Sequence, residues 1–322
     1  MHCGPTEWSH DAEPWLAVAM SMKIGIFGGD FAGKTADDVI AAARTVHEEG
    51  FATFWAPQVF GFDALTLLAV VAREVPEIEL GTAVVPTYPR HPMVLAAQAM
   101  TTQAISGGRL LLGIGLSHQL VVEGMWGLSF EKPVRHMREY LTVLTALIRE
   151  GNVSFTGETM SASCPVAVEG STPMPILVAA LGPKMLELAG TVADGTVTWM
   201  TGPKGIGEHI VPSITAAAER ASRPAPRIVV ALPVCVTDDP DAARDRANKI
   251  FQMYGSLPSY RAMLDRSGAE GPGDVVIVGD ESSVRDQIAA LADLGTSDLI
   301  AAEFAPYKSP DRERTRELLR SL

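Results

Sequence analysis

The segment from Glu79 to His118 constrains the fold most strongly, because it contains two buried-type strands joined by one helix. The strands cover residues 79–85 and 110–115, and the helix covers residues 92–105. Both strands are short apolar runs bounded by turn residues, and with the helix they form a βαβ unit, which builds parallel sheets. Ligands of parallel-sheet proteins lie beyond the carboxyl ends of the strands. We therefore expect a site near Ala83–His91 and Leu116–Gln119.

The rest of the chain repeats this alternation of apolar strands and helices. Strands are predicted at residues 23–27, 53–55, 79–85, 110–115, 176–180, 196–199, 228–236 and 298–303. Helices are predicted at residues 35–49, 64–74, 92–105, 134–149, 184–192, 206–220, 241–254 and 312–321. Eight strand–helix pairs in a chain of 322 residues predict an α/β fold, a (β/α)8 TIM barrel, because an open doubly wound sheet usually has fewer such pairs.

Two insertions interrupt the alternation. Residues 153–168, with Thr156-Gly157 at the turn, predict a hairpin, and residues 257–294 add loops and helices before the last strand. No Pro/Ser linker or low-complexity tract divides the chain, so we predict a single barrel domain over residues 22–322. Residues 1–21 form an N-terminal extension that we expect to be disordered, with Met20 and Met22 as alternative translation starts.

Composition and charge limit the classes of function. The chain has 47% hydrophobic residues, enough for a large core, and a net charge of −12 with a pI near 5.1, which disfavours binding to nucleic acid or an anionic membrane. Cys3, Cys164 and Cys235 are scattered without a CxxC spacing, so we expect no disulfide framework and a reducing cytoplasm. The first 21 residues show no targeting segment. No histidine motif indicates a metal, and we expect His47 and His209 at the surface.

Residues 28–35, GGDFAGKT, match the phosphate-binding pattern GxxxxGK[ST] between a predicted strand and a predicted helix. In one interpretation, the glycines and Lys34 bind a nucleoside triphosphate. In the other, which we favour, this is the first loop of the barrel, with Thr35 as the helix N-cap and Asp38 completing a capping box. The remaining strand–helix pairs favour the second interpretation, because a nucleotide hydrolase would not use them to close a barrel.

A second glycine turn follows the fifth predicted strand, where the chain passes through Gly182 into a helix that begins at Pro183. Proline at the first helical position leaves the following amides, at Lys184 to Leu186, unpaired, and a helix N-terminus carries partial positive charge. A phosphate would therefore be held here, and Lys184 would strengthen its binding. The alternative is an ordinary turn with a solvated surface lysine.

Several pieces of the sequence resemble one family. They are residues 81–92 (GTAVVPTYPRHP), 107–118 (GGRLLLGIGLSH), 133–140 (PVRHMREY), 155–158 (FTGE) and 179–183 (AALGP) followed by 193–195 (ADG). Over Lys23 to Glu303 the chain resembles the bacterial luciferase-like (β/α)8 flavin and deazaflavin oxidoreductases of the luciferase-like monooxygenase superfamily. It is most similar to the actinobacterial branch that uses coenzyme F-420. The resemblance also implies a homodimer that acts on a small-molecule substrate.

In this family the cofactor lies across the barrel mouth, with its phosphate on the loop that is Leu181–Lys184 here and its ring against a bulged third strand. The bulge contains a non-proline cis peptide bond, which would fall at Ala83–Val84. The cofactor-binding residues expected here are Ala83, Val84, Ser117, Ala180, Leu181, Gly182, Pro183, Lys184 and Met185. No metal site is expected.

The chemistry that the resemblance implies is hydride transfer at the cofactor ring, with the protein supplying binding, orientation and a proton. His118 is the expected proton donor, because it ends the fourth strand and imidazole titrates near neutral pH. Gln58 stands where many relatives carry a catalytic histidine. Glutamine can hydrogen-bond a substrate or the edge of the cofactor ring but cannot relay a proton. The activity of the related sugar-phosphate dehydrogenases is therefore disfavoured for this chain. A hydrogen-bonded loop histidine without a catalytic role is the alternative for His118.

Further side chains are predicted around the mouth. Arg90, His91 and Arg109 are candidates for contacts with the anionic tail of the cofactor, with salt bridges to surface carboxylates as the alternative. Trp55 and Trp199 end their strands, where they would wall the substrate pocket or pack in the core. The third pocket candidate is Trp126, in an apolar loop over residues 125–130 that would form a lid or a contact between subunits.

Four functions remain open from the sequence. An F-420-dependent oxidoreductase is favoured, followed by an FMN-dependent luciferase-like monooxygenase fed by a separate reductase. These two differ in oxygen chemistry, because reduced FMN reacts with dioxygen, whereas the deazaflavin is restricted to hydride transfer. A P-loop nucleotide-binding protein and a cofactor-free barrel are the others. The sequence identifies neither the organic substrate nor the direction of hydride transfer.

Overall fold

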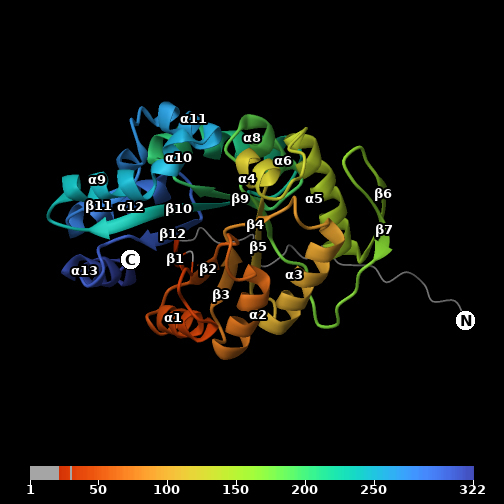
Figure 1. Cartoon of the computed structure of the whole chain (residues 1–322), viewed down its shortest axis with the longest axis horizontal. Helices are drawn as coiled ribbons and strands as arrows, with labels where there is room; N and C mark the ends of the chain where they lie inside the picture. Colours follow the sequence, from red (N-terminus) through yellow and green to blue (C-terminus); the bar gives the residue numbers. More distant parts are fainter. Residues whose placement is uncertain (1–21, 30) are drawn as a thin grey trace, which may run out of the picture.

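Eight parallel strands close into a barrel surrounded by helices, as predicted (Figure 1). The computed structural model describes residues 22–29 and 31–322, so the expected extension over residues 1–21 lies outside the described residues. The barrel strands, in their order around the barrel, are β1 (Lys23–Phe27), β2 (Thr53–Ala56), β3 (Glu79–Thr82), β5 (Leu110–Gly115), β8 (Ile176–Val178), β9 (Gly195–Trp199), β10 (Arg227–Val236) and β12 (Asp298–Glu303). Pairing of β12 with β1 closes the ring.

Helices follow the strands where the sequence predicted them. They are α1 (Ala36–Glu48), α2 (Ala64–Glu74), α3 (Pro92–Ser106), α5 (Pro133–Glu150), α6 (Pro183–Thr191), α8 (Val211–Arg220), α9 (Pro240–Ile250) and α13 (Pro310–Arg320). Additional pieces are α4 (Gln119–Gly124), α7 (Pro203–Gly205), the π-helix η2 (Ile206–Ile210), α10 (Gln252–Ser256), α11 (Pro258–Ser267), η3 (Pro272–Asp274), β11 (Ile277–Gly279) and α12 (Glu281–Asp293). Within the part of the chain that the structure describes, no helix has both the length and the apolarity to cross a membrane.

The third strand is interrupted, whereas the sequence predicted one continuous strand over residues 79–85. It stops at Thr82 and resumes as β4 (Val85–Pro86), and the peptide bond between Ala83 and Val84 is cis, at the expected position. The interruption presses on β5, where a Cβ added to Gly113 would lie 2.0 Å from the Thr82 carbonyl oxygen. Two hydrogen bonds of 2.8 Å join the Thr82 hydroxyl to the backbone of Gly113. Only glycine therefore allows the two strands to approach this closely.

The predicted hairpin is present as β6 (Asn152–Thr156) and β7 (Ser161–Pro165), and it lies outside α5 in Figure 1. Its turn is fixed by Glu139 of α5, whose carboxylate accepts hydrogen bonds from the amides of Glu158 and Thr159 at 3.0 and 2.7 Å. Burial opposes ionisation of Glu139, but the hydrogen bonds from the turn outweigh it and lower the carboxyl pKa to about 2. The hairpin is thus attached to α5 by a charged anchor.

An ion-pair network joins the strands at the amino end of the barrel. Arg227, the first residue of β10, donates to both carboxylate oxygens of Asp298 on β12 at 2.8 and 2.6 Å. Its guanidinium also reaches Glu79 of β3 at 3.3 Å, and Glu79 accepts a 3.0 Å hydrogen bond from Lys23 of β1. Burial opposes the charge of Glu79, yet Arg227 and Lys23 outweigh it and lower the pKa of this carboxyl. Four strands, not all adjacent in the sheet, are linked in this way.

Replacement of Arg227 by methionine should lower the free energy of unfolding by about 3–5 kcal/mol at neutral pH, because it leaves the Asp298 carboxylate, only 2% exposed, without its partner. The pKa of Glu79 in the folded protein lies below its ordinary value of 4.5. The ion pair of Glu79 therefore stabilises the fold fully above pH 4.5, and this contribution is lost as the pH falls through the folded-state pKa. The difference in free energy of unfolding between the wild type and Arg227→Met should therefore shrink as the pH falls below 4.5.

Urea denaturation of the wild type and the variant, followed across this pH range, tests the prediction. Arg220→Met, which removes an exposed cation at the end of α8, is the control and should change stability little. A loss at neutral pH of less than about 1 kcal/mol for Arg227→Met, the range of an exposed ion pair, would contradict the proposed role of the network.

Candidate active site at the barrel mouth

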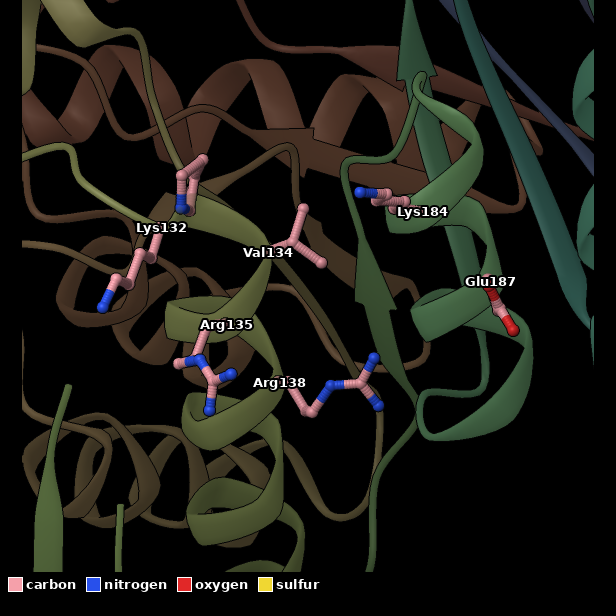
Figure 2. Close-up of a pocket in the computed structure, with 7 residues that line it drawn as sticks. Lys132, Val134, Arg135, Arg138, Lys184 and Glu187 are labelled. Carbon is pink, nitrogen blue, oxygen red and sulfur yellow. The ribbon is translucent and has the colours of Figure 1, made fainter. Parts of the chain in front are cut away.

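The turn between β8 and α6 is the best anion-binding candidate among the predicted site residues. Leu181 is half-buried, whereas Gly182, Pro183 and Lys184 are exposed, and α6 starts at Pro183 without a side-chain cap (Figure 2). Within residues 22–29 and 31–322, the amides of Gly182 and Lys184 have no protein acceptor. N–H groups at a helix start suit a phosphate. The described residues contain no group of three His, Cys, Asp or Glu side chains that could hold a metal ion.

One detail of this turn corrects the sequence analysis. The amides of Met185 and Leu186 were expected to be unpaired, but both donate to the carbonyl of Gly182, at 3.0 and 2.9 Å. Ala180 and Met185 are buried in the core, and their contact with the cofactor stays a prediction. The first helical turn closes on itself, which leaves fewer donors than the proline position suggested.

His209, which the sequence analysis placed at the surface, holds the turn in position. Its Nε2 lies 2.8 Å from the Leu181 carbonyl oxygen, and the side chain is half-buried. It lies in the π-helix η2, which precedes α8, and α8 packs on α6 at Gly190, where an added Cβ would lie 2.5 Å from the backbone of Ile214. The helical pattern of residues 206–220 gave no sign of this contact, because the register change occurs only in the packed structure.

The other predicted cofactor residues lie on the strands next to this turn. Ala83 and Val84 are half-buried and pack on the apolar cluster inside the barrel. Ser117 follows β5 with a φ of 64°, which is uncommon for a residue other than glycine, and it is half-buried. Ala83 and Val84 therefore lie at the carboxyl end of β3, and Ser117 lies at that of β5, which is the neighbour of β8 and hence of the strand that leads into the turn before α6.

His118 lies at the start of α4, where burial lowers its pKa below 6.5. The imidazole is therefore mostly neutral at neutral pH and suited to accept a proton. Its ring is 5.8 Å from that of Tyr260 on α11. The second insertion, predicted from the sequence only as loops and helices, therefore contacts His118. The phenol of Tyr260 is neutral as well, since burial raises its pKa.

A chain of aromatic rings runs from His118 across the mouth. Tyr260 meets Tyr254 at 4.9 Å, Tyr254 meets Trp199 at 6.0 Å, and Trp199 stacks on Phe27 at 5.7 Å, measured between ring centroids. These rings join the ends of β1 and β9 to α10 and α11. Trp199 is half-buried within this chain, which agrees with its predicted place at the mouth.

Trp55 does not line the mouth, in contrast to its predicted role. Its side chain is 0% exposed, lies inside the barrel against Gly81, and donates a 2.7 Å hydrogen bond to the hydroxyl of Thr53. The missing side chain at Gly81 provides the space that the indole fills. Trp126 is half-buried after α4, next to the exposed Met125, and its role in the substrate pocket stays a prediction.

Gln58 has a structural role that the sequence did not show. Its side-chain oxygen accepts a 2.7 Å hydrogen bond from the Ala64 amide at the start of α2 and a weak one from Arg90 at 3.5 Å. Arg90 is also paired with Asp63, the N-cap of α2. The side-chain oxygen of Gln58 is thus occupied by contacts within the protein. The catalytic role of Gln58 stays a prediction, and only its side-chain nitrogen would be available for it. Arg90 binds a carboxylate, as the alternative interpretation held.

Arg109 and His91 are also engaged within the protein. Arg109, just before β5, donates to the carbonyls of Ala72 near the end of α2 and of Ile78 just before β3, at 2.9 and 2.5 Å. This is the amino end of the barrel, so the expected contact with a cofactor tail is wrong for Arg109. His91 caps α3 and lies 3.3 Å from the Ser161 carbonyl oxygen of the hairpin.

The predicted capping box of α1 is confirmed. The Asp38 carboxylate accepts from both the amide and the hydroxyl of Thr35 at 2.8 Å, and the Asp38 amide donates back to the Thr35 hydroxyl. The hydroxyl that a nucleoside triphosphatase would present to a magnesium ion is therefore used in the helix cap. This geometry favours the barrel-loop interpretation of residues 28–35.

A cluster that the sequence analysis missed follows the interrupted third strand. The Tyr88 ring stacks on His136 of α5 at 4.1 Å and on Phe130 at 5.3 Å, and His136 Nε2 lies 3.1 Å from the Thr87 hydroxyl. Burial lowers the pKa of His136 to about 4, while burial and the charge of Glu123 raise the pKa of Tyr88 to about 12. The buried Tyr88 hydroxyl has no hydrogen-bond partner among the described residues.

Comparisons with known proteins agree with this fold. The luciferase-like monooxygenase family model matches residues 17–298. A 5,10-methylenetetrahydromethanopterin reductase of Methanolobus tindarius is 30% identical over 281 residues, which cover 86% of this chain and 85% of the reductase.

Among solved structures, the coenzyme F-420-dependent tetrahydromethanopterin reductase of Methanopyrus kandleri has a TM-score of 0.75 at 22% identity and covers 94% of this chain and 98% of its own. An FMN complex of the oxygenating component of 3,6-diketocamphane monooxygenase from Pseudomonas putida has a TM-score of 0.73 at 18% identity, over 93% of this chain and 96% of its own. At these identities both structures show the shared barrel fold. The chain belongs to the luciferase-like monooxygenase family of oxidoreductases.

Proposed function

We propose that this enzyme transfers a hydride between coenzyme F-420 and a small organic substrate. The observation that carries the proposal is the turn before α6, where the amides of Gly182 and Lys184 have no acceptor among the described residues, one strand away from the interrupted third strand. A phosphate-bearing cofactor with its phosphate on this turn could lay its ring across Ala83 and Val84. A putative coenzyme F420-dependent oxidoreductase of Mycobacterium tuberculosis is 28% identical over 87% of this chain, which supports the deazaflavin over FMN.

When bound, the deazaflavin supplies the two-electron hydride chemistry. The residues of this chain have separate tasks. Gly182 and Lys184 donate N–H groups to the phosphate, and His209 holds their turn through the Leu181 carbonyl. The aromatic rings that include Trp199 shield the mouth from water, which strengthens polar interactions inside it.

His118 moves the proton that accompanies the hydride. In oxidation of an alcohol, the unprotonated ring nitrogen of its imidazole accepts the hydroxyl proton, and in reduction of a carbonyl the imidazolium returns it. Burial lowers the pKa of His118, so the proton-accepting form prevails at neutral pH. Tyr260, at 5.8 Å between ring centroids, orients the imidazole from α11.

An FMN-dependent monooxygenase is the second candidate. The FMN-bound monooxygenase of the same fold supports it, with a TM-score of 0.73. The turn before α6 suits the phosphate of either cofactor, so this turn alone does not separate the two.

A homodimer and a cytoplasmic location stay predictions. Support for the dimer comes from the outer surface of α2 and α3, which border a groove of about 440 Å³. Val70 and Val94 on these helices are 46% and 45% exposed, and apolar surface of this kind is typical of subunit interfaces.

Titration of the purified protein with coenzyme F-420 and with FMN, followed by ligand fluorescence, tests the proposed cofactor. We expect micromolar or tighter binding of the deazaflavin, at least about tenfold tighter than that of FMN, which corresponds to about 1.4 kcal/mol. Turnover with F-420 should consume no dioxygen. Preference for FMN together with oxygen consumption would instead support the monooxygenase.

Replacement of His118 by alanine should lower the rate of alcohol oxidation by about 10²–10⁴-fold while leaving F-420 affinity nearly unchanged. In the wild type the rate should fall as the pH drops through a value below 6.5, because the imidazole becomes protonated and can no longer accept the proton. The variant should lack this acid limb. His47→Ala, on the outer helix α1, is the control, and an acid limb that persists in His118→Ala would exclude His118 as the base.

Replacement of His209 by alanine removes the 2.8 Å hydrogen bond to Leu181 and should loosen the turn before α6. Affinity for F-420 and for FMN should both fall, by about fivefold, as expected for one hydrogen bond of about 1 kcal/mol. Binding of riboflavin, which lacks the phosphate, should not change. Equal losses for riboflavin and FMN in calorimetric titrations would show that His209 does not act through the phosphate site.

A further inference from the structure

Half-buried aromatic side chains form a continuous layer that begins at His118, and we call this layer the aromatic wall. Its members are Phe27, Trp199, Phe251, Tyr254 and Tyr260. They come from β1, β9, α10, α11 and the residue between α9 and α10. Centroids of neighbouring rings in the wall are 4.9 to 6.0 Å apart, and the Tyr260 ring lies 5.8 Å from that of His118. In Figure 1, α4, α10 and α11 all lie above the barrel strands.

The wall keeps ring surface available to a ligand, because none of its members is fully buried. An apolar cluster that includes Met200 and Leu264 packs against its members from β9, α10 and α11. Exposed side chains on the same elements are apolar as well. Leu120, two residues after His118, is 71% exposed, and Met253 on α10 is 58% exposed. A ligand that packs on the wall therefore meets ring faces and apolar side chains.

Charged side chains do not act on the wall beside His118. Burial lowers the pKa of His118 and raises the pKa values of Tyr254 and Tyr260, and no ionised side chain among the described residues contributes to these shifts. The nearest cation on an aromatic ring of this region is Arg246, which lies 5.2 Å from the centroid of Phe304, a buried ring outside the wall. The wall thus offers a ligand no partner for a charge.

Such surroundings discriminate between substrates by charge. A carboxylate or phosphate that moved from water to the wall would lose its hydration without gaining an ion pair, which is strongly unfavourable. An apolar group gains free energy in proportion to the area that it buries. A planar ring gains more, because it makes offset or edge-to-face contacts with aromatic side chains.

We propose that the aromatic wall selects an uncharged substrate whose secondary alcohol or ketone group is carried on a planar or cyclic apolar framework. This inference rests on the proposed function and names its substrate class. In the oxidative direction the substrate gives the hydrogen on its carbinol carbon to the deazaflavin as a hydride and its hydroxyl proton to His118, and it leaves as the ketone. Tyr254 contacts the framework of the substrate and determines specificity, without a part in proton transfer.

Matched substrates that differ by one charged group test this selection. The neutral compound is 1-phenylethanol, and 4-(1-hydroxyethyl)benzoate carries a carboxylate on the same framework. With saturating F-420, kcat/KM for the neutral alcohol should exceed that for the carboxylate by at least about 100-fold, because the carboxylate is desolvated without a partner. The methyl ester of the benzoate has a similar size without the charge, and it should stay within about tenfold of 1-phenylethanol.

Binding of the product ketones gives a second measurement that needs no turnover. Calorimetric titrations use acetophenone and 4-acetylbenzoate, with the complex of the protein and oxidised F-420 and also with the protein alone. Acetophenone should bind at least about 100-fold more tightly than 4-acetylbenzoate.

Variants of Tyr254 assign the selection to the wall. Tyr254→Arg places a cation in the wall, so 4-acetylbenzoate should bind about tenfold more tightly than to the wild type, as expected for a charge-assisted contact, and acetophenone more weakly. Tyr254→Leu should weaken acetophenone by about threefold through loss of a ring contact and keep the preference for it. Tyr307→Arg, at an 84% exposed residue outside the wall, is the matched control and should change neither affinity. Thermal unfolding of each variant verifies that the fold is retained.

The outcomes separate this inference from the proposed function. If alcohols are oxidised with F-420 but the neutral and charged compounds react and bind equally, the substrate class is wrong and hydride transfer stands. A preference for the carboxylate, or failure of both ketones to bind, would also overturn the substrate class. Absence of F-420 binding would overturn the proposed function, and the titrations of the protein alone would still show whether the wall selects uncharged ligands.

Discussion

The ion-pair network at the amino end of the barrel is the constraint on which the mouth depends. Arg227 bonds to Asp298 and Glu79, so strands from both halves of the chain start from one fixed point. The strands of the barrel all run in the same direction, so their carboxyl ends lie at the same end of the barrel and form its mouth. The turn before α6, the interrupted third strand and His118 all lie at this mouth, although they are far apart in sequence. Without the ion pairs of Arg227, the strands that carry these three features would not be held in one closed barrel.

Charge is distributed unequally between the two ends of the barrel. At the amino end, carboxylates and guanidinium groups neutralise one another in close pairs, which fix the strands and leave nothing for a ligand. At the mouth, the groups are neutral rings, the amides of Gly182 and Lys184, which have no acceptor among the described residues, and the uncharged His118 and Tyr88. Arg138 and Lys184, which have no ion-pair partner within the described residues, line a cavity between α5 and α6.

The sequence predicted the strands and most helices well, because each buried strand of a parallel barrel is a continuous apolar run and each helix has its own periodicity. It also predicted the glycine turn at Gly182 that leads into α6 and, through the family resemblance alone, the cis bond after Ala83. It failed for side chains whose partners are distant. Arg109 and Trp55 had the right residue types for the mouth, yet one binds the end of α2 and the other fills the barrel against a missing side chain.

The sequence by itself determined the (β/α)8 fold, the family and the turn that can hold a phosphate, since all three depend on local patterns of apolar residues, glycine and proline. Only the tertiary structure decided which polar groups remain free. Gln58 accepts a hydrogen bond from the first amide of α2, His209 supports the turn before α6, and Arg138 has no ion-pair partner within the described residues. The physical reason is that hydrogen bonds and ion pairs are made across the fold, so a side chain is available to a ligand only when no nearer partner has taken it.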